Sequence, residues 1–74
     1  MNQKTMRRIA SHRVLMPNGQ ILTLSVIEIS SGIVQKCYPL VEESAFTEWF
    51  PGDIVIRHDE EGFQRAYYEN KPIE

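Results

Sequence analysis

The chain has 74 residues, of which 42% are hydrophobic and 24% are charged, and its formal net charge is −2. This composition excludes intrinsic disorder and predicts a single folded domain over residues 1–74, with a small core. The single cysteine, Cys37, excludes an internal disulfide and a cysteine-based zinc cluster within one chain. No apolar stretch reaches the roughly 20 residues that cross a membrane, and we expect no secretory signal, so the predicted location is cytoplasmic.

The first predicted element is a β-hairpin. Residues 1–6 are expected to form a loose N-terminal arm, and strands follow over Ile9–Met16 and Gln20–Ser30. Between the strands lies Pro-Asn-Gly at residues 17–19. Proline suits the first central position of a turn and glycine suits the left-handed position after it, so this sequence predicts a type I turn with a G1 bulge.

The second predicted strand changes the face that its apolar residues occupy. Leu22, Leu24 and Val26 share one face of an extended chain, whereas Ile27 and Ile29 lie on the other. A slip of this kind requires a bulge, or a bend where the strand crosses from one sheet to another. Either feature predicts a curved, two-layered or barrel-like arrangement of strands.

The next elements are a third strand, an ordered connection and a second hairpin. The third strand covers Ile33–Leu40, and Pro39 near its end favours an edge position. Residues 41–49 are expected to form one short helical turn or an ordered loop, because this stretch is too short for a stable helix. Asp53–His58 and Phe63–Glu69 then form the last hairpin.

The predicted fold is therefore all-β. It is a small, five-stranded, antiparallel-rich β-sandwich or open barrel that ends in a loose tail over residues 70–74.

Two stretches of the sequence carry a resemblance to a known family. They are HRVLMPNGQILTLSVIEISSGIVQKCYPL, residues 12–40, and FPGDIVI, residues 50–56. Together they resemble the start of amidohydrolase-superfamily enzymes, which are metal-dependent hydrolases. The resemblance implies a fold similar to the small β-sandwich, or composite domain, that accompanies the catalytic barrel in that superfamily. The chain is also similar to short uncharacterised bacterial proteins with the arrangement PL…E…TEW…PG, a similarity that implies no function.

The hydrolase activity does not follow from this resemblance. In that family a His-x-His pair just after the Pro-Gly segment begins the metal site, whereas this chain has Arg57-His58 there. The residues that follow are too few for a barrel of about 250 residues.

One candidate site is a cluster of potential metal ligands, His58, Asp59 and Glu61, beside one turn. His12 would join them if its strand lay beside Asp53–His58. The alternative is a set of solvated turn charges, because successive residues that leave a strand point in different directions. We expect no bound cofactor.

Cys37 is a second candidate, as a nucleophile paired with His12 or His58. Its alternative role is an inert thiol that fills a small gap in the core. No complete catalytic set is present in the sequence, and we expect a protein that is not an enzyme.

Charge is divided unevenly along the chain. Residues 1–41 carry five basic side chains and one acidic side chain, whereas residues 42–74 carry three basic and nine acidic side chains. The basic residues Lys4, Arg7, Arg8 and Arg13 suggest phosphate contacts. The acidic overall balance argues against nucleic-acid binding, which ranks third among the functions considered.

The function favoured by the sequence is protein association. A domain this small has edge strands, and pairing them across a two-fold axis would give a homodimer or a complex with a protein partner. Trp49, Tyr67 and Tyr68 are the candidate interaction residues. For the two tyrosines the reason is that only one face of the last strand can belong to the core, so one of the rings is exposed. The second function considered is binding of a small ligand or a divalent metal ion at the His58 turn.

Overall fold

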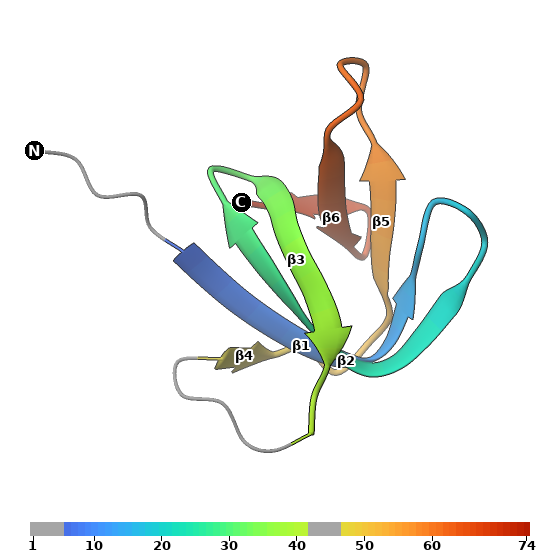
Figure 1. Ribbon diagram of the computed structural model, residues 1–74, viewed down its shortest axis with the longest axis vertical. Coiled ribbons are helices and arrows are strands. Elements are labelled where there is room, and N and C mark those ends of the chain that lie inside the picture. Colours follow the sequence, from blue (N-terminus) through green and yellow to red (C-terminus); the bar gives the residue numbers. More distant parts are fainter. Residues whose placement is uncertain (1–5, 42–46) are drawn as a thin grey trace, which may run out of the picture.

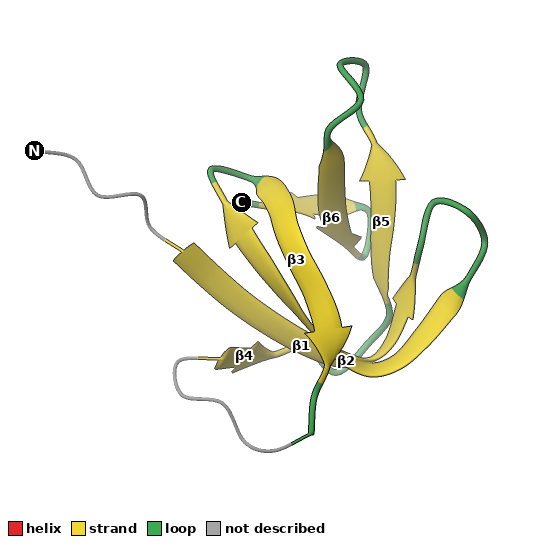
Figure 2. Cartoon of the chain, viewed as in Figure 1, coloured by secondary structure: helices red, strands yellow, loops and turns green. Residues whose placement is uncertain are grey.

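The computed structural model describes residues 6–41 and 47–74 as one open, curled β-sheet (Figure 1). Seven strands follow in chain order: β1 (Met6–Leu15), β2 (Ile21–Ser30), β3 (Ile33–Pro39), β4 (Thr47–Trp49), β5 (Ile54–His58), β6 (Gln64–Tyr68) and β7 (Lys71–Ile73). Their spatial order is β3-β2-β1-β5-β6-β7, and β4 pairs with β1. These residues contain no helix (Figure 2), so no helix among them could cross a membrane, and the predicted all-β fold is confirmed.

The strand count differs from the five expected because two strands are only three residues long. The predicted loose tail instead contains β7, which pairs with β6 and buries Ile73 in the core. In the predicted helical turn or loop, residues 47–49 form β4, which runs parallel to β1, and residues 42–46 lie outside the described residues. Strands this short carry no readable periodicity in a sequence.

The first hairpin has the predicted turn. Met16 donates its N–H to the Gln20 carbonyl, and Gly19 donates its N–H to the Met16 carbonyl at 3.0 Å. Gly19 has a φ of 89°, whereas Asn18 is not in the positive-φ region. This combination distinguishes a type I turn with a G1 bulge from a type I′ turn.

Both strands of this hairpin bend at one position, where His12 and Leu24 interrupt the ladder between β1 and β2. Leu24 has a φ of 47°, which reverses the alternation of side chains along β2. Leu22 therefore reaches the same core as Ile27, although the two are five positions apart and an odd spacing places residues on opposite faces of a regular strand. The predicted change of face is real, but it lies at Leu24 rather than between Val26 and Ile27.

A bulge also occurs, in the pairing of β2 with β3 rather than within β2. The register shifts between Glu28 and Ile29, and Gln35 is the additional residue on β3. Bulges of this kind bend an edge strand and increase its twist.

The bend lets β1 pair with two different strands on one side. Arg8–Ala10 lie beside β4, and Val14–Leu15 lie beside β5, both in parallel. Ser11 lies between these segments and is 1% exposed. Its hydroxyl donates to the Gly52 carbonyl at 2.6 Å and accepts the Arg13 N–H at 3.2 Å. One side chain thus satisfies two main-chain groups where the ladder breaks.

The core lies inside the curl of the sheet. Its buried residues are Ile9, Val14, Ile27, Ile29, Ile54, Ile56, Ala66 and Ile73. β3 comes close to β6 across this core, and the Arg65 guanidinium of β6 donates to the Gly32 carbonyl in the β2–β3 turn at 3.3 Å. β3 and β6, which are far apart in the order of strands, therefore enclose one core.

Candidate interaction surface

Four large apolar side chains are exposed around the bend in the first hairpin. Ile21 and Leu24 lie on β2 and are 50% and 38% exposed, Val41 follows β3 and is 87% exposed, and Trp49 on β4 is 47% exposed. We call these four residues the bend surface. Exposed apolar residues that gather in one region are typical of sites where proteins associate.

Contacts at the bend connect Leu24 and Trp49 to neighbouring segments of the chain. The Leu40 N–H donates to the Leu24 carbonyl at 2.9 Å, which brings the start of the β3–β4 connection to β2. The ring of His12, opposite Leu24 in the register, packs edge-on against Trp49 with a centroid distance of 4.8 Å and an interplanar angle of 87°. His12 thus packs against Trp49 of this surface rather than against the turn after β5.

An open groove of about 460 Å³ lies beside the bend surface, where β3 ends. All the side chains that line it are uncharged: Ile21, Leu22, Thr23, Ser25, Cys37, Tyr38 and Pro39. Among the described residues, the groove therefore offers no charged side chain to an occupant.

The groove follows a part of β2 that has a strand on one side only. β3 pairs with β2 from Ser25 onward, and Leu40 adds a bond to Leu24. Within residues 6–41 and 47–74, no strand pairs with Ile21–Thr23 on the side away from β1. We call Ile21–Thr23 the open edge.

Main-chain groups of the open edge point into the groove. In an antiparallel pair, successive residues alternate between bonding to the partner strand and pointing away from it. Gln20 bonds to Met16, so Ile21 and Thr23 direct their N–H and C=O groups away from β1. The Thr23 carbonyl accepts a 3.2 Å bond from the Ser25 hydroxyl and retains a second lone pair.

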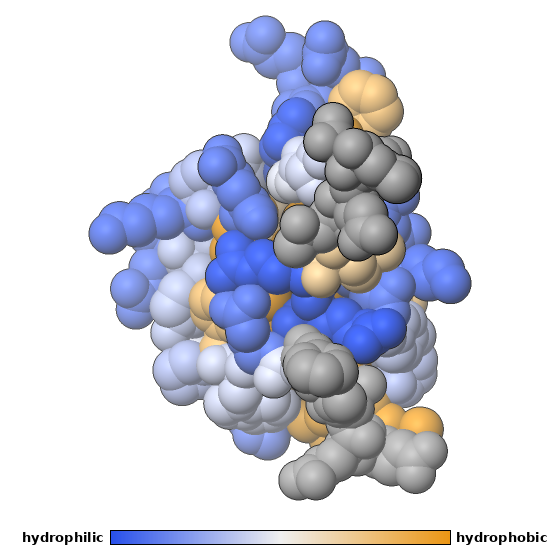
Figure 3. Space-filling view, turned by 90° about the vertical axis from the view of Figure 1, so that its left-hand side faces the viewer, coloured by the Kyte–Doolittle hydropathy of each residue, from blue (hydrophilic) through white to orange (hydrophobic). Residues whose placement is uncertain are grey.

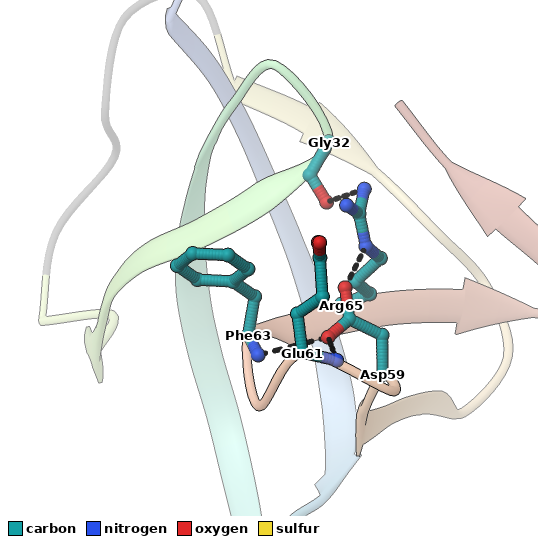
Figure 4. Close-up of polar contacts among 5 residues, drawn as sticks. All are labelled: Gly32, Asp59, Glu61, Phe63 and Arg65. Atoms are coloured by element: carbon teal, nitrogen blue, oxygen red, sulfur yellow. Dashed lines mark hydrogen bonds and ion pairs between the residues drawn. The ribbon is translucent and has the colours of Figure 1, made fainter.

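The turn after β5 uses its carboxylate for structure. One Asp59 carboxylate oxygen accepts the N–H groups of Glu61 and Phe63 at 2.8 and 2.9 Å, and the other accepts the Arg65 Nε–H at 2.8 Å. Figure 4 shows the Arg65 guanidinium between this carboxylate and the Gly32 carbonyl. The hydrogen bond from Arg65 holds the pKa of Asp59 below its ordinary value.

The expected metal ligands are not gathered into a site. Asp59 is engaged by the turn, His58 is an exposed residue at the end of β5, and His12 packs on Trp49. Across the described parts of the chain, no group of three or more histidine, cysteine, aspartate or glutamate side chains could hold a metal ion. His58 is thus exposed, as the solvated-turn alternative expects, whereas the Asp59 carboxylate is bonded within the turn.

Cys37 has the environment of a structural thiol. It is partly buried against the core, and burial raises the pKa of its thiol. A raised pKa reduces the thiolate fraction at neutral pH, and the thiolate is the nucleophilic form. This agrees with the role of Cys37 as filler beside the core.

Carboxylates lie beside the basic side chains of β1. Strongly hydrophilic residues gather across the middle of the face shown in Figure 3. The ion pairs of β1 are Arg7 with Glu48 at 2.7 Å, Arg8 with Glu28 at 3.1 Å, and Arg13 with Asp53 at 3.7 Å. Three of the four basic residues considered for phosphate contacts therefore have acidic neighbours, and Lys4 lies outside the described residues.

The Glu28 carboxylate is also bonded to a tyrosine. Tyr38 donates its hydroxyl to Glu28 Oε2 at 2.6 Å, and Arg8 donates to the same oxygen. The tyrosine bond is the main cause that lowers the pKa of Glu28, and the carboxylate in turn raises the pKa of Tyr38. These contacts join the outer faces of β1, β2 and β3.

The three aromatic residues proposed from the sequence for interaction differ in position. Trp49 lies in the bend surface, whereas Tyr67 lies beneath the Arg57 guanidinium and Tyr68 packs on Phe50 at a centroid distance of 4.9 Å. Both tyrosines are partly buried. Ile21, Leu24 and Val41 were not among the sequence-based candidates, and the slip in the pattern of β2 was the signal that pointed to this region.

Comparison with known proteins found no matching family model, no similar curated protein and no similar solved structure. The resemblance to the amidohydrolase composite domain therefore stays a prediction.

Proposed function

We propose that this protein is a small, non-catalytic association domain that binds an extended polypeptide segment as an added strand. The open edge carries this proposal, because it offers unpaired main-chain donors and acceptors beside a neutral groove. In strand addition, main-chain hydrogen bonds supply affinity and grooves for side chains supply specificity. Ile21, which is half exposed, supplies apolar contact area in the edge itself.

The shape of the sheet supports this role. We propose that the sheet acts as a small open barrel, in which the contact between β3 and β6 and the bond from Arg65 to Gly32 hold the curl. A fixed curl keeps the open edge extended and ready to pair, which reduces the entropy lost on binding. A cytoplasmic location agrees with the single thiol of Cys37.

The proposal is tested with a short, uncharged peptide of alternating threonine and valine, blocked at both ends, added to the isotope-labelled protein. We expect chemical-shift changes in the N–H signals of Ile21 and Thr23 and of the groove residues Cys37 and Tyr38. A matched peptide with lysine at its central position should bind less well, because the groove offers no carboxylate. Shifts confined to other strands, or no shifts at all, would contradict strand addition at the open edge.

A further inference from the structure

The open edge differs from the two outer edges of the sheet. β3 carries Lys36, a bulge at Gln35 and Pro39, and β7 is three residues long with Lys71 and Pro72. Charged residues, prolines, bulges and short length are the features by which proteins keep their edges from pairing. Of these protective features, the open edge has only its short length. Its sequence, Ile-Leu-Thr, contains β-branched and apolar residues and no charged residue.

The neutral lining of the groove restricts what can occupy it. A charged side chain brought into the groove would lose water without gaining an opposite charge. The Ile-Leu-Thr segment of another copy of the chain is also uncharged. Its unpaired N–H and C=O groups could bond to those of the open edge. We infer that the occupant of the open edge is the same segment of a second copy of this chain, paired antiparallel across a two-fold axis. This inference rests on the proposed function.

The length of the open edge fixes the register of this pairing. At one end the Gln20 carbonyl already accepts a hydrogen bond from Met16, which follows β1. At the other end the Leu24 carbonyl already accepts a hydrogen bond from Leu40. The open edge is three residues long on each copy. In an antiparallel pair centred on it, Leu22 lies opposite the partner's Leu22, and Ile21 lies opposite the partner's Thr23. The Ile21 and Thr23 groups that point away from β1 are then the ones that exchange hydrogen bonds between copies.

The dimer is expected to be weak. Its strand pairing is short, and the added area comes from side chains of the groove such as the half-exposed Ile21. Interfaces below about 1,200 Å² are typical of transient complexes. Self-association should therefore appear only as the protein concentration rises.

Sedimentation equilibrium over a series of concentrations tests the inference. We expect the average mass of the wild-type protein to rise from monomer toward dimer. The variant Ile21→Glu places a charge in the groove, where the residue opposite it on β1 is the uncharged Leu15, and should weaken the dimer at least tenfold. The control Gln35→Glu adds the same charge to exposed β3 and should leave the mass distribution unchanged. A monomer at every concentration, or a dimer that Ile21→Glu leaves intact, would overturn the inference.

A cross-linking experiment tests the register. Residues opposite each other in a non-hydrogen-bonded antiparallel pair have Cα atoms about 4.5 Å apart, within the range that a disulfide spans. In a Cys37→Ser background, Leu22→Cys should give a covalent dimer in a glutathione buffer, and Val34→Cys, also packed beside the core, should not. Equal cross-linking of both variants would exclude the proposed register. Peptide binding by a strictly monomeric protein would refute the second copy as occupant and retain strand addition.

Discussion

Ser11→Ala should destabilise the fold more than its small change in volume suggests. The Ser11 hydroxyl is buried at the break in β1, where it bonds to the Gly52 carbonyl at 2.6 Å and to the Arg13 N–H at 3.2 Å. Alanine removes both bonds and leaves two main-chain groups without these partners. A buried polar group that loses its partner costs about 1–3 kcal/mol. Because Gly52 is only partly buried and Arg13 is exposed, we expect a loss of about 1–3 kcal/mol for the two groups together.

This loss is large for a chain of this size. A native domain has about 0.05–0.15 kcal/mol of stability per residue, which gives about 4–11 kcal/mol for 74 residues. A loss of 2 kcal/mol should lower the melting temperature of a domain this small by at least about 8 °C. Thermal and urea unfolding followed by circular dichroism measure the effect. The slope of the urea transition should stay unchanged, because the variant exposes the same surface on unfolding.

Ser30→Ala is the matched control. Ser30 is also buried on a strand, but its hydroxyl has no hydrogen-bond partner among the residues that the structure describes. Removing an unsatisfied polar group is neutral or stabilising. A Ser11→Ala protein within 0.5 kcal/mol of wild type, or an equal loss in Ser30→Ala, would refute the reasoning about the break in β1.

Three further predictions concern other parts of the fold. Gly32→Ala should destabilise the fold more than Gly19→Ala in urea unfolding. Both glycines have positive φ, but the new Cβ at residue 32 would lie 2.9 Å from Arg65 Nη1, which must then move and weaken its hydrogen bond to the Gly32 carbonyl. Equal losses would show that backbone strain alone decides. Tyr38→Phe should raise the pKa of Glu28, because the hydrogen bond from Tyr38 lowers it in the folded state. The loss in free energy of unfolding relative to wild type should therefore be largest at neutral pH and shrink as the pH falls below about 4.3. A loss that does not depend on pH would contradict this reasoning. Cys37 should react with iodoacetamide at pH 8 more slowly than glutathione does, because burial raises the pKa of the Cys37 thiol. Reaction at the rate of glutathione would contradict a buried thiol.

Local chemistry made the first hairpin predictable. Pro-Asn-Gly at residues 17–19 specifies its turn without help from the rest of the chain, and the structure contains that turn. The turn between β6 and β7 gave no comparable signal. It places Glu69 and Asn70 at positive φ, and only Asn70 is a residue that favours this region. With Pro72 inside it, β7 did not resemble a strand in the sequence, and its pairing depends on the burial of Ile73.

The candidate site was predictable only in part. Trp49 is among the sequence-based interaction candidates, and it is exposed in the structure. Ile21 and Leu24 were read as ordinary strand residues, because their exposure depends on where β3 stops beside β2. That end point is a tertiary property, set by Pro39 and by the bond from Leu40 to Leu24. Periodicity along one strand does not contain this information.

The bend in β2 connects the stability of the fold with the proposed site. The positive φ at Leu24 moves the apolar side chains of β2 from one face to the other, so that Leu22 and Ile27 reach one core. The same change of direction leads β2 away from the line of β3, whose pairing ends at Ser25. Ile21–Thr23, before the bend, therefore have no strand of the described chain paired on the side away from β1. The bend that separates them from β3 is the one that places Ile27 and Ile29 in the core. An open edge next to exposed apolar side chains is then a consequence of how this short sequence closes its core, and the pairing of a second copy would satisfy the main-chain groups that the bend leaves open.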